Sequence, residues 1–299
     1  MAKILVVGLN PAWQTVLGFE DFQPGEVNRA QSITTLASGK GFNAGKVLRR
    51  LGHEVTLLQI LGGENGRKCL AACEAIGIRS LQAWVETETR PCITLLHNGH
   101  PAGESTEIIA PFRVGETGLA GRLLELLPPQ ADAFDAMAVC GSVPEGLESG
   151  FYDALLARFP AAIAVVDAWQ GLSAESLTSA VCIKLNRTEY GKLRDALGAE
   201  AIAEALFLVT SGGREASVLR GGDDIARVSP PILPKIVNPI GAGDTVTAGV
   251  VHNLLGGVGP VEAFRRALAL GTASCLERLP AEYRDEDAER LLPQSRVLT

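Results

Sequence analysis

The chain has 299 residues, and its 46% hydrophobic and 20% charged residues provide a large core and exclude an intrinsically disordered protein. Its 27 Lys and Arg against 34 Asp and Glu give a net charge of −7, and no apolar run approaches the roughly 18–20 residues that span a bilayer, so neither nucleic acid nor a membrane is an expected partner. The first apolar stretch, Ile4 to Val7, is shorter than the roughly 7–15 residues of a signal-peptide core, which favours a cytoplasmic location.

Short apolar runs alternate with segments of helical periodicity along most of the chain. We predict strands at residues 4–7, 55–60, 136–139, 162–166, 182–184 and 206–210. We predict helices at residues 42–51, 116–127, 150–158, 188–197, 244–255, 261–275 and 286–292. This alternation is typical of an α/β domain with helices on both faces of a mainly parallel sheet, and we interpret residues 1–299 as one such domain.

Two β-rich segments lack intervening helices, at residues 13–32 and about 84–110. The second contains a predicted hairpin of residues 92–96 and 106–109 around the turn dipeptide Asn98-Gly99, which makes His97 and His100 turn residues rather than metal ligands. Another hairpin is predicted at residues 216–220 and 225–229. We expect the first two segments to form a small sheet outside the main one, placed as a lid over a site.

The six cysteines form no C-x-x-C pair, and several lie inside predicted strands. In a cytosolic chain they are expected to be buried free thiols.

The strongest local motif is Gly241-Ala242-Gly243-Asp244, which leads directly into an apolar helix. Small residues allow close backbone approach to a ligand, and the N–H groups of a helix start attract anions. The alternative is a loop with Asp244 as an acidic N-cap. At a helix N-terminus the ionised carboxylate is favoured, so the pKa of Asp244 is expected to fall.

Two further motifs also precede predicted helices. Gly39-Lys40-Gly41-Phe42-Asn43 offers backbone amides and two polar side chains for a sugar, or forms a turn with a solvated lysine. Lys184-Leu185-Asn186-Arg187-Thr188-Glu189 follows a strand, where open α/β sheets bind ligands, but Asn186 and Glu189 could equally form a capping box.

Taken together these motifs resemble the ribokinase-like (PfkB) carbohydrate kinases over nearly the whole chain. The matching segments follow in the family's order, namely Gly39-Lys40-Gly41-x-Asn43, Gly141-Ser142-Val143-Pro144-x-Gly146, Asn186-x-x-Glu189, Thr210-Ser211-Gly212-Gly213 and Gly241-Ala242-Gly243-Asp244. The resemblance implies a three-layer α/β sandwich with a mainly parallel central sheet and a small β-sheet lid.

The resemblance also implies an ATP-dependent phosphotransferase. In that family the amides of Gly241, Ala242 and Gly243 form an anion hole for the transferred phosphoryl group, and Asp244 accepts the hydroxyl proton. The ATP-contacting positions are Lys184, Asn186, Glu189, Ser211 and Gly213. Glu189 and Asn186 are expected to hold Mg²⁺ through water, because Mg²⁺ keeps several waters and needs few protein ligands.

Within the family the chain is most similar to the sugar-phosphate branch of tagatose-6-phosphate kinases and 1-phosphofructokinases. The matching segments include Thr89-Arg90-x-Cys92-Ile93, Thr106-Glu107-Ile108 and Asn238-Pro239-Ile240. The substrate-binding positions are Gln14, Arg29, Gly39, Lys40, Asn43 and Arg90, of which the three basic residues suit a phosphate group. Each of Arg29 and Arg90 could also be an ordinary surface charge.

The chain departs from the family at Gln14, where an Asp that binds sugar hydroxyls is usual; Gln offers an amide donor instead of a charge. This leaves three readings open: a tagatose-6-phosphate kinase-like enzyme, a 1-phosphofructokinase or other sugar or nucleoside kinase on the same scaffold, and a non-catalytic sugar-phosphate sensor. The last is disfavoured because Asp244, Asn186 and Glu189 are all present. A homodimer formed through the lid is a further expectation from the resemblance.

Overall fold

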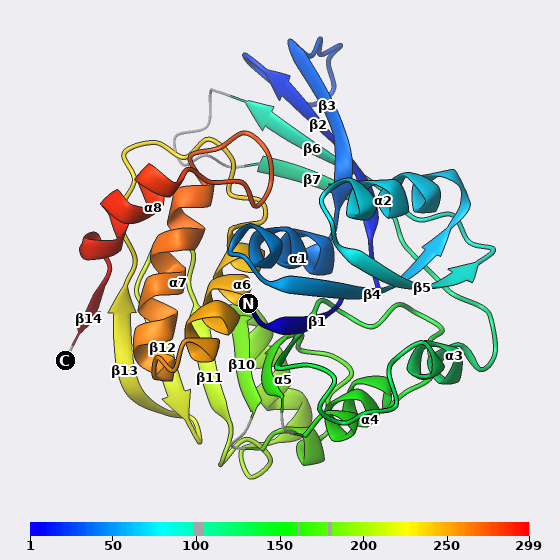
Figure 1. Ribbon diagram of the computed structural model, residues 1–299. Coiled ribbons are helices and arrows are strands. Elements are labelled where there is room, and N and C mark those ends of the chain that lie inside the picture. The colour runs from blue at the N-terminus through cyan, green and yellow to red at the C-terminus, as the bar shows by residue number, and fades with distance from the viewer. Residues whose placement is uncertain (98–104, 161, 179–180, 299) are drawn as a thin grey trace.

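The main sheet contains ten strands in the order β14-β13-β12-β11-β10-β9-β8-β1-β4-β5 in the computed structural model, which describes residues 1–97, 105–160, 162–178 and 181–298 (Figure 1). Pairing is parallel from β5 to β11 and antiparallel from β11 to β14. The strands are β1 (Lys3–Val7), β4 (Glu54–Gly62), β5 (Arg79–Val85), β8 (Ala136–Cys140), β9 (Ile163–Asp167), β10 (Val181–Asn186), β11 (Leu206–Thr210), β12 (Ala216–Arg220), β13 (Asp223–Ser229) and β14 (Arg296–Leu298).

Helices cover both faces of this sheet, because alternate residues of its central strands are apolar on both sides. In β1, Ile4 and Val6 belong to one buried cluster, and Leu5 and Val7 belong to the other. The first face carries α1 (Lys40–Arg50), α2 (Gly63–Ala75), α6 (Ala242–Leu255), α7 (Pro260–Ser274) and α8 (Asp285–Leu291). The second carries α3 (Leu119–Glu125), α4 (Phe151–Arg158) and α5 (Arg187–Leu197). The predicted three-layer α/β sandwich is therefore confirmed.

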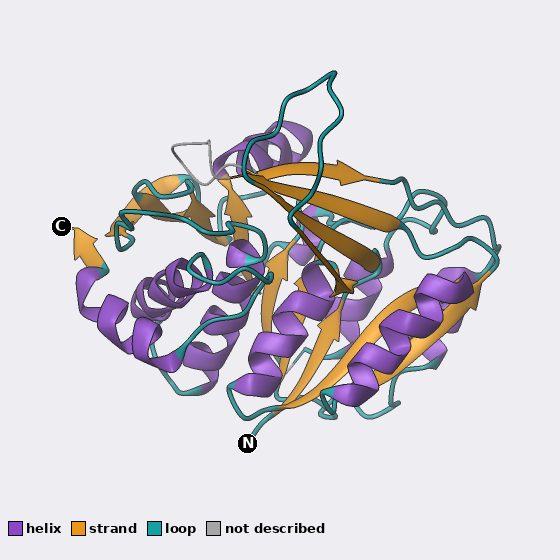
Figure 2. Ribbon diagram, turned by 90° about the horizontal axis from the view of Figure 1, so that it is seen from above, coloured by secondary structure: helices purple, strands orange, loops and turns teal. Residues whose placement is uncertain are grey.

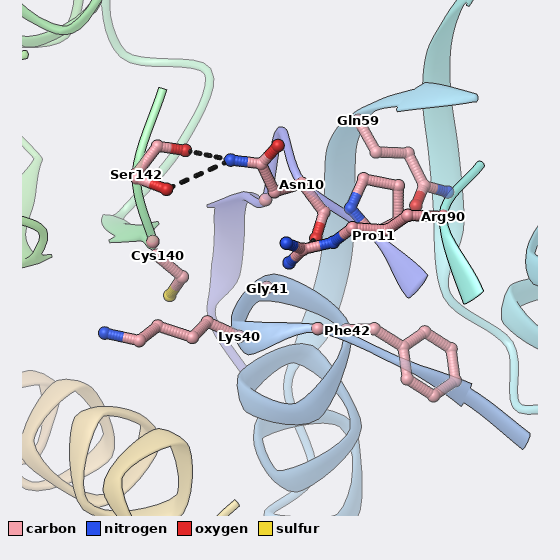
Figure 3. A pocket seen from close by; sticks show the side chains of 12 residues that line it. Asn10, Pro11, Lys40, Gly41, Phe42, Gln59, Arg90, Cys140 and Ser142 are labelled. Atoms are coloured by element: carbon pink, nitrogen blue, oxygen red, sulfur yellow. Dashed lines mark hydrogen bonds between the residues drawn. The ribbon is translucent and has the colours of Figure 1, made fainter. Parts of the chain in front are cut away.

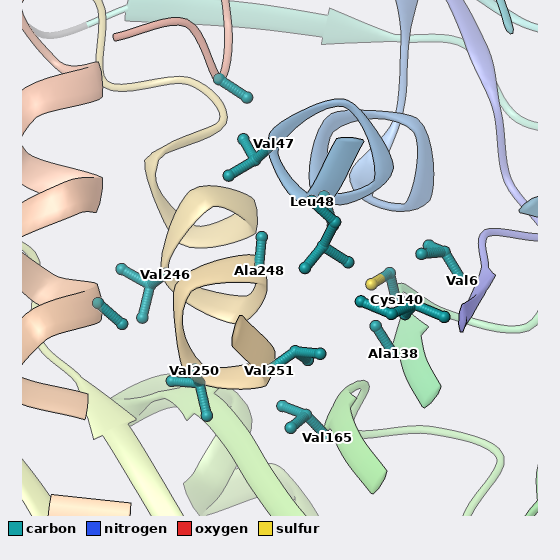
Figure 4. Close-up of a cluster of buried hydrophobic side chains, with 14 of the residues drawn as sticks. Val6, Val47, Leu48, Ala138, Cys140, Val165, Val246, Ala248, Val250 and Val251 are labelled. Carbon is teal, nitrogen blue, oxygen red and sulfur yellow. The ribbon is translucent and has the colours of Figure 1, made fainter. Parts of the chain in front are cut away.

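Helices α1 and α6 lie against each other on the first face, and their packing fixes the position of both N-termini. Val47 and Leu48 of α1, Ala248 and Val251 of α6 and Val6 of β1 meet in one cluster (Figure 4). The start of α1 also lies directly against the end of β1, since a Cβ atom added at Gly41 would come within 2.5 Å of the Gly8 Cα atom. Only glycine at both positions allows this approach.

A separate four-stranded sheet has the order β3-β2-β6-β7 and forms the lid, which stands above the main sheet in Figure 1; Figure 2 shows the molecule from above. Its strands are β2 (Ala12–Phe19), β3 (Ser32–Ser38), β6 (Pro91–His97) and β7 (Ser105–Ile109). The small sheet was predicted, but the first predicted segment, residues 13–32, ends too early because β3 continues to Ser38. The start of the second predicted segment, about residue 84, does not belong to the lid. It is the end of β5, which pairs in parallel with β4 in the main sheet.

Most predicted strands and helices are present with shifts of a few residues at their ends. The prediction missed α2, whose glycines at 63 and 66 and mixed polarity hide its helical pattern. The Asn98-Gly99 turn and His100 lie outside the described residues. The six thiols are free, and five of them are buried, as expected. Among the described helices, none has both the length and the apolar character that crossing a membrane requires.

Candidate active site

The N-terminus of α6 opens on Gly241, whose φ of 80° lies in the left-handed region. A Cβ atom there would come within 2.6 Å of the Ala281 backbone nitrogen, so both conformation and space require glycine. No side chain caps the helix. The Ala242 amide donates to the Pro239 carbonyl at 3.3 Å, which leaves the amides of Gly243 and Asp244 available to an anionic ligand.

Asp244 lies in this first turn and is only 7% exposed. It is not the N-cap that the alternative interpretation required. Its Oδ2 atom instead accepts a hydrogen bond of 2.7 Å from Asn43 Nδ2 in α1. The α1–α6 packing thus places one carboxylate beside the free amides.

The predicted fall in the pKa of Asp244 is wrong. Burial and the nearby Asp167 carboxylate raise this pKa to about 6, against the opposing effects of Lys40, the Asn43 hydrogen bond and Lys184. The helix N-terminus argument failed because it ignored desolvation and a second acid. A carboxyl group with a pKa near 6 is a stronger base than an ordinary aspartate.

That second acid, Asp167, is the last residue of β9 and is fully buried. It accepts hydrogen bonds from Lys40 Nζ at 2.9 Å, Lys184 Nζ at 2.8 Å and Thr247 Oγ1 at 2.9 Å. Burial alone would raise its pKa, but the two ammonium groups lower it to about 2. Lys40 is therefore not a solvated turn lysine.

Lys184 is almost completely buried, and its ammonium group lies under the start of α6. A Cβ atom added at Gly243 would come within 3.1 Å of Lys184 Nζ. From this position the positive charge of Lys184 would stabilise an anion bound at the N-terminus of α6.

Asn186 and Glu189 form the capping box of α5, with Asn186 Oδ1 accepting from the Glu189 amide at 2.8 Å and Glu189 Oε2 accepting from the Asn186 amide at 3.0 Å. Both residues also line the cavity beneath the lid that is described below, so their capping role does not exclude the predicted ligand-binding role. Glu189 Oε1 makes only a 3.4 Å contact, to Lys40 Nζ. Within the described residues no cluster of three or more His, Cys, Asp or Glu could enclose a metal ion.

Two cavities meet at the start of α6. The first, of about 390 Å³, lies between the lid and the main sheet and is lined by the predicted residues Gln14, Gly39, Lys40, Asn43, Arg90, Lys184, Asn186, Glu189, Gly241, Gly243 and Asp244. The second, of about 680 Å³, is more apolar and includes Gly213, Ile232, Leu233 and Val246. They share Thr210, Pro239 and Gly243, so the two cavities adjoin end to end. Below we call them the lid cavity and the apolar cleft.

The lid cavity contains buried acceptors that lack a partner. Gln14 Nε2 donates to Thr94 Oγ1 at 2.6 Å, while Gln14 Oε1 is buried and unsatisfied. Asn43 Oδ1 is unsatisfied in the same way. The predicted amide donor of Gln14 is thus already bound to Thr94, and the atom left without a partner is its acceptor. Two unpaired carbonyl oxygens suit a ligand that donates hydroxyl groups.

Arg90 lies between the lid cavity and a smaller adjoining cavity of about 100 Å³. Its guanidinium donates to the Asn10 carbonyl at 3.1 Å, and the Asn10 side chain donates to Ser142 (Figure 3). Arg90 is thus held facing the cavities and is not a free surface charge.

Two predicted residues are not among those lining either cavity. Arg29 is exposed on the chain between β2 and β3, and Ser211 is absent from the cleft lining although its neighbours Gly212 and Gly213 contribute. Asp167 was missed because a lone acid after an apolar run carries no motif. Its position at the carboxyl end of a parallel strand was the available signal.

An unsatisfied helix N-terminus and a basic carboxylate between two joined cavities define a phosphotransferase acting on small molecules. The chain belongs to the pfkB family of carbohydrate kinases, whose family model matches residues 1–285. It is 25% identical to a tagatose-6-phosphate kinase of Staphylococcus epidermidis, with 99% of each chain covered.

Solved structures share the fold. Phosphofructokinase-2 from Escherichia coli in complex with fructose-6-phosphate has a TM-score of 0.77 at 20% identity, covering 98% of this chain and 99% of that one. A Thermotoga maritima protein named a possible 1-phosphofructokinase has a TM-score of 0.80 at 20% identity, with 99% of each chain covered. The family implies phosphoryl transfer to a sugar hydroxyl with ATP as donor.

Proposed function

We propose that the protein transfers the γ-phosphoryl group of ATP to a hydroxyl group of a sugar phosphate, as a tagatose-6-phosphate kinase does. The observation that carries the proposal is the position of Asp244 and the α6 amides at the junction of the lid cavity and the apolar cleft. The full-length similarity to tagatose-6-phosphate kinases supports the substrate class. A 1-phosphofructokinase activity is the second candidate, because the described residues that line the lid cavity do not distinguish tagatose 6-phosphate from fructose 1-phosphate.

In this proposal the base of ATP occupies the apolar cleft beside Gly213, in the loop that also contains Ser211, and its triphosphate points toward the lid cavity. The amides of Gly241, Ala242 and Gly243 stabilise charge on the transferred group, with Lys184 beneath them. Asp244, oriented by Asn43, accepts the proton of the attacking hydroxyl. When bound, Mg²⁺ neutralises phosphate charge, and Asn186 and Glu189 would hold it through water.

The sugar phosphate occupies the lid cavity. The buried acceptors of Gln14 and Asn43 receive its hydroxyl groups, and the Gly39 backbone lies beside them. Arg90 faces its phosphate group, with Lys40 as a second cation. Assay of ADP release over tagatose 6-phosphate, fructose 1-phosphate, fructose 6-phosphate and the free sugars tests this assignment. Activity confined to free sugars or nucleosides, or ATP binding without turnover of any of them, would contradict it.

A homodimer formed through the lid is part of the proposal. In such a dimer Arg29, which lines neither cavity of its own chain, would reach the lid cavity of the partner subunit. The lid carries exposed apolar side chains close to Arg29, with Val27 80% and Ile33 68% exposed. Sedimentation equilibrium of the protein tests the dimer, and a monomer at micromolar concentration would remove this part. The cytoplasmic location also stays a prediction.

Replacing Arg90 with Ala is expected to raise KM for the sugar phosphate by about 10- to 100-fold, because a charge-assisted hydrogen bond is lost. The KM for ATP and the KM for any unphosphorylated sugar should change less than about threefold. Steady-state kinetics with both sugar types measures the difference. Equal loss with both would show that Arg90 supports the lid and does not select the phosphate.

Turnover is expected to decrease in acid as Asp244 becomes protonated. Since the pKa of Asp244 is raised to about 6, kcat/KM should be constant above pH 7 and fall about tenfold per pH unit below pH 5.5. An unphosphorylated substrate provides the control, because a sugar phosphate itself takes up a proton near pH 6. A profile without an acid limb between pH 5 and 7 would reject Asp244 as the base.

A further inference from the structure

Strand β7 forms the edge of the lid that extends over both cavities. Its alternate residues Ser105, Glu107 and Ile109 point to one face. Ser105 borders the apolar cleft, and Glu107 and Ile109 border the lid cavity. Ile108 points to the other face of the strand. Glu107 itself is partly exposed to solvent, as expected of a residue on an edge strand that lines an open cavity. Glu107 is thus a lid residue directed at the site.

The register of the lid places Glu107 in line with two buried polar side chains. Glu107 is directly opposite Thr94 on β6, and Gln14 on β2 is opposite the next inward-facing residue of β6, Cys92. Gln14 and Thr94 are 2% and 0% exposed and are joined by the 2.6 Å hydrogen bond. The inner face of the lid therefore carries a polar row of Gln14, Thr94 and Glu107, in which only Glu107 is charged.

Glu107 is also the acid of the lid cavity that has no other task. Asp244 is bonded to Asn43, and Glu189 caps α5. Within the described part of the chain, Glu107 makes no hydrogen bond or ion pair. Burial raises its pKa, while the nearby Arg90 guanidinium acts in the opposite direction. A carboxylate and a guanidinium of opposite charge thus line the same cavity.

Resting on the proposed function, we propose that Glu107 is a specificity-determining residue whose carboxylate accepts a hydrogen bond from a hydroxyl group of the sugar phosphate. Gln14 can offer that substrate a neutral acceptor only, so Glu107 supplies the charged acceptor. Next to Arg90 it orients the substrate, since the phosphate end is attracted by the guanidinium and repelled by the carboxylate. Because Glu107 is on the lid, the same bond holds the lid over the bound sugar.

The Glu107→Gln variant tests the proposal in the full-length protein. Loss of a charge-assisted hydrogen bond should raise KM for the preferred sugar phosphate by about 10- to 100-fold and change kcat less than about threefold. The KM for ATP should stay within about twofold. Glu20→Gln, an exposed acid at the end of β2, is the matched control and should match the wild type in both constants. An unchanged KM for the sugar, or an equal rise for ATP, would overturn the proposal.

Monodeoxy analogues of the sugar phosphate then identify the contact by a double-difference measurement. For one analogue, the Glu107→Gln substitution should have no further effect, because the hydroxyl that Glu107 binds is already absent. If Glu107→Gln raises KM by the same factor for every analogue as for the full sugar phosphate, the hydroxyl contact is contradicted. If the wild type phosphorylates only free sugars, the proposed function fails, while the same comparison with deoxy forms of that sugar still decides the role of Glu107.

Discussion

The Asp244→Asn variant is expected to lower kcat by about 10²- to 10⁴-fold, the range that a positioned general base contributes. The amide is close in size to the carboxylate and can keep the contact with Asn43, but it cannot accept the hydroxyl proton. Binding of ATP should change little, because the α6 amides and Lys184 remain. Coupled ADP-release kinetics and calorimetric titration with ATP measure the two effects. Asp132→Asn, an exposed aspartate in a turn, is the matched control.

The same variant should be more stable than the wild type. The pKa of Asp244 is about 6 in the folded protein against an ordinary value of 3.8, so the folded state binds more protons between these pH values. Wild-type stability therefore decreases as the pH rises from about 4 to about 6, and the ionised acid costs about 1–3 kcal/mol at pH 7. Removing the charge relieves this cost. An inactive variant that is also less stable at pH 7 would point to a structural role instead.

The fold was largely predictable from the sequence, because the central strands of the main sheet are continuous apolar runs that indicate buried parallel strands. The β11 prediction agrees with the observed strand from Leu206 to Thr210. Strand ends and the lid were less predictable. Ser32–Ser38 lies at the edge of the lid with only its last two residues buried, so its polar, β-branched sequence gave no burial signal.

The site was predictable where a motif encodes local backbone geometry, as at Gly241 and the Asn186 capping box. It was not predictable where it depends on tertiary burial. The sequence contains no sign that Asp167 and Asp244 are buried near each other, and this pairing reverses the direction of the Asp244 pKa shift. Likewise, which amide atom of Gln14 remains unpaired depends on Thr94, which is 80 residues away.

Replacing Asp167 with Asn is expected to be the most destabilising change at the site, at about 3–5 kcal/mol, because it leaves a buried ammonium without its carboxylate. Lys184 is 4% exposed and has no other ion pair among the described residues, while Lys40 keeps Glu189. Urea unfolding followed by circular dichroism measures the loss. The exposed Arg113–Glu145 pair gives the control, and Glu145→Gln should cost less than about 1 kcal/mol.

A second substitution separates the charge effect from lost packing. Adding Lys184→Met to Asp167→Asn removes the orphaned ammonium, so the double variant should recover part of the lost stability. The acid limb of kcat/KM in the single variant should move below that of the wild type, because the like charge that raises the pKa of Asp244 is gone while the lowering effects of Lys40 and Lys184 remain. Substrate protonation is the same for both enzymes and cannot cause this shift. If the acid limb stays in place, Asp167 does not set the basicity of Asp244.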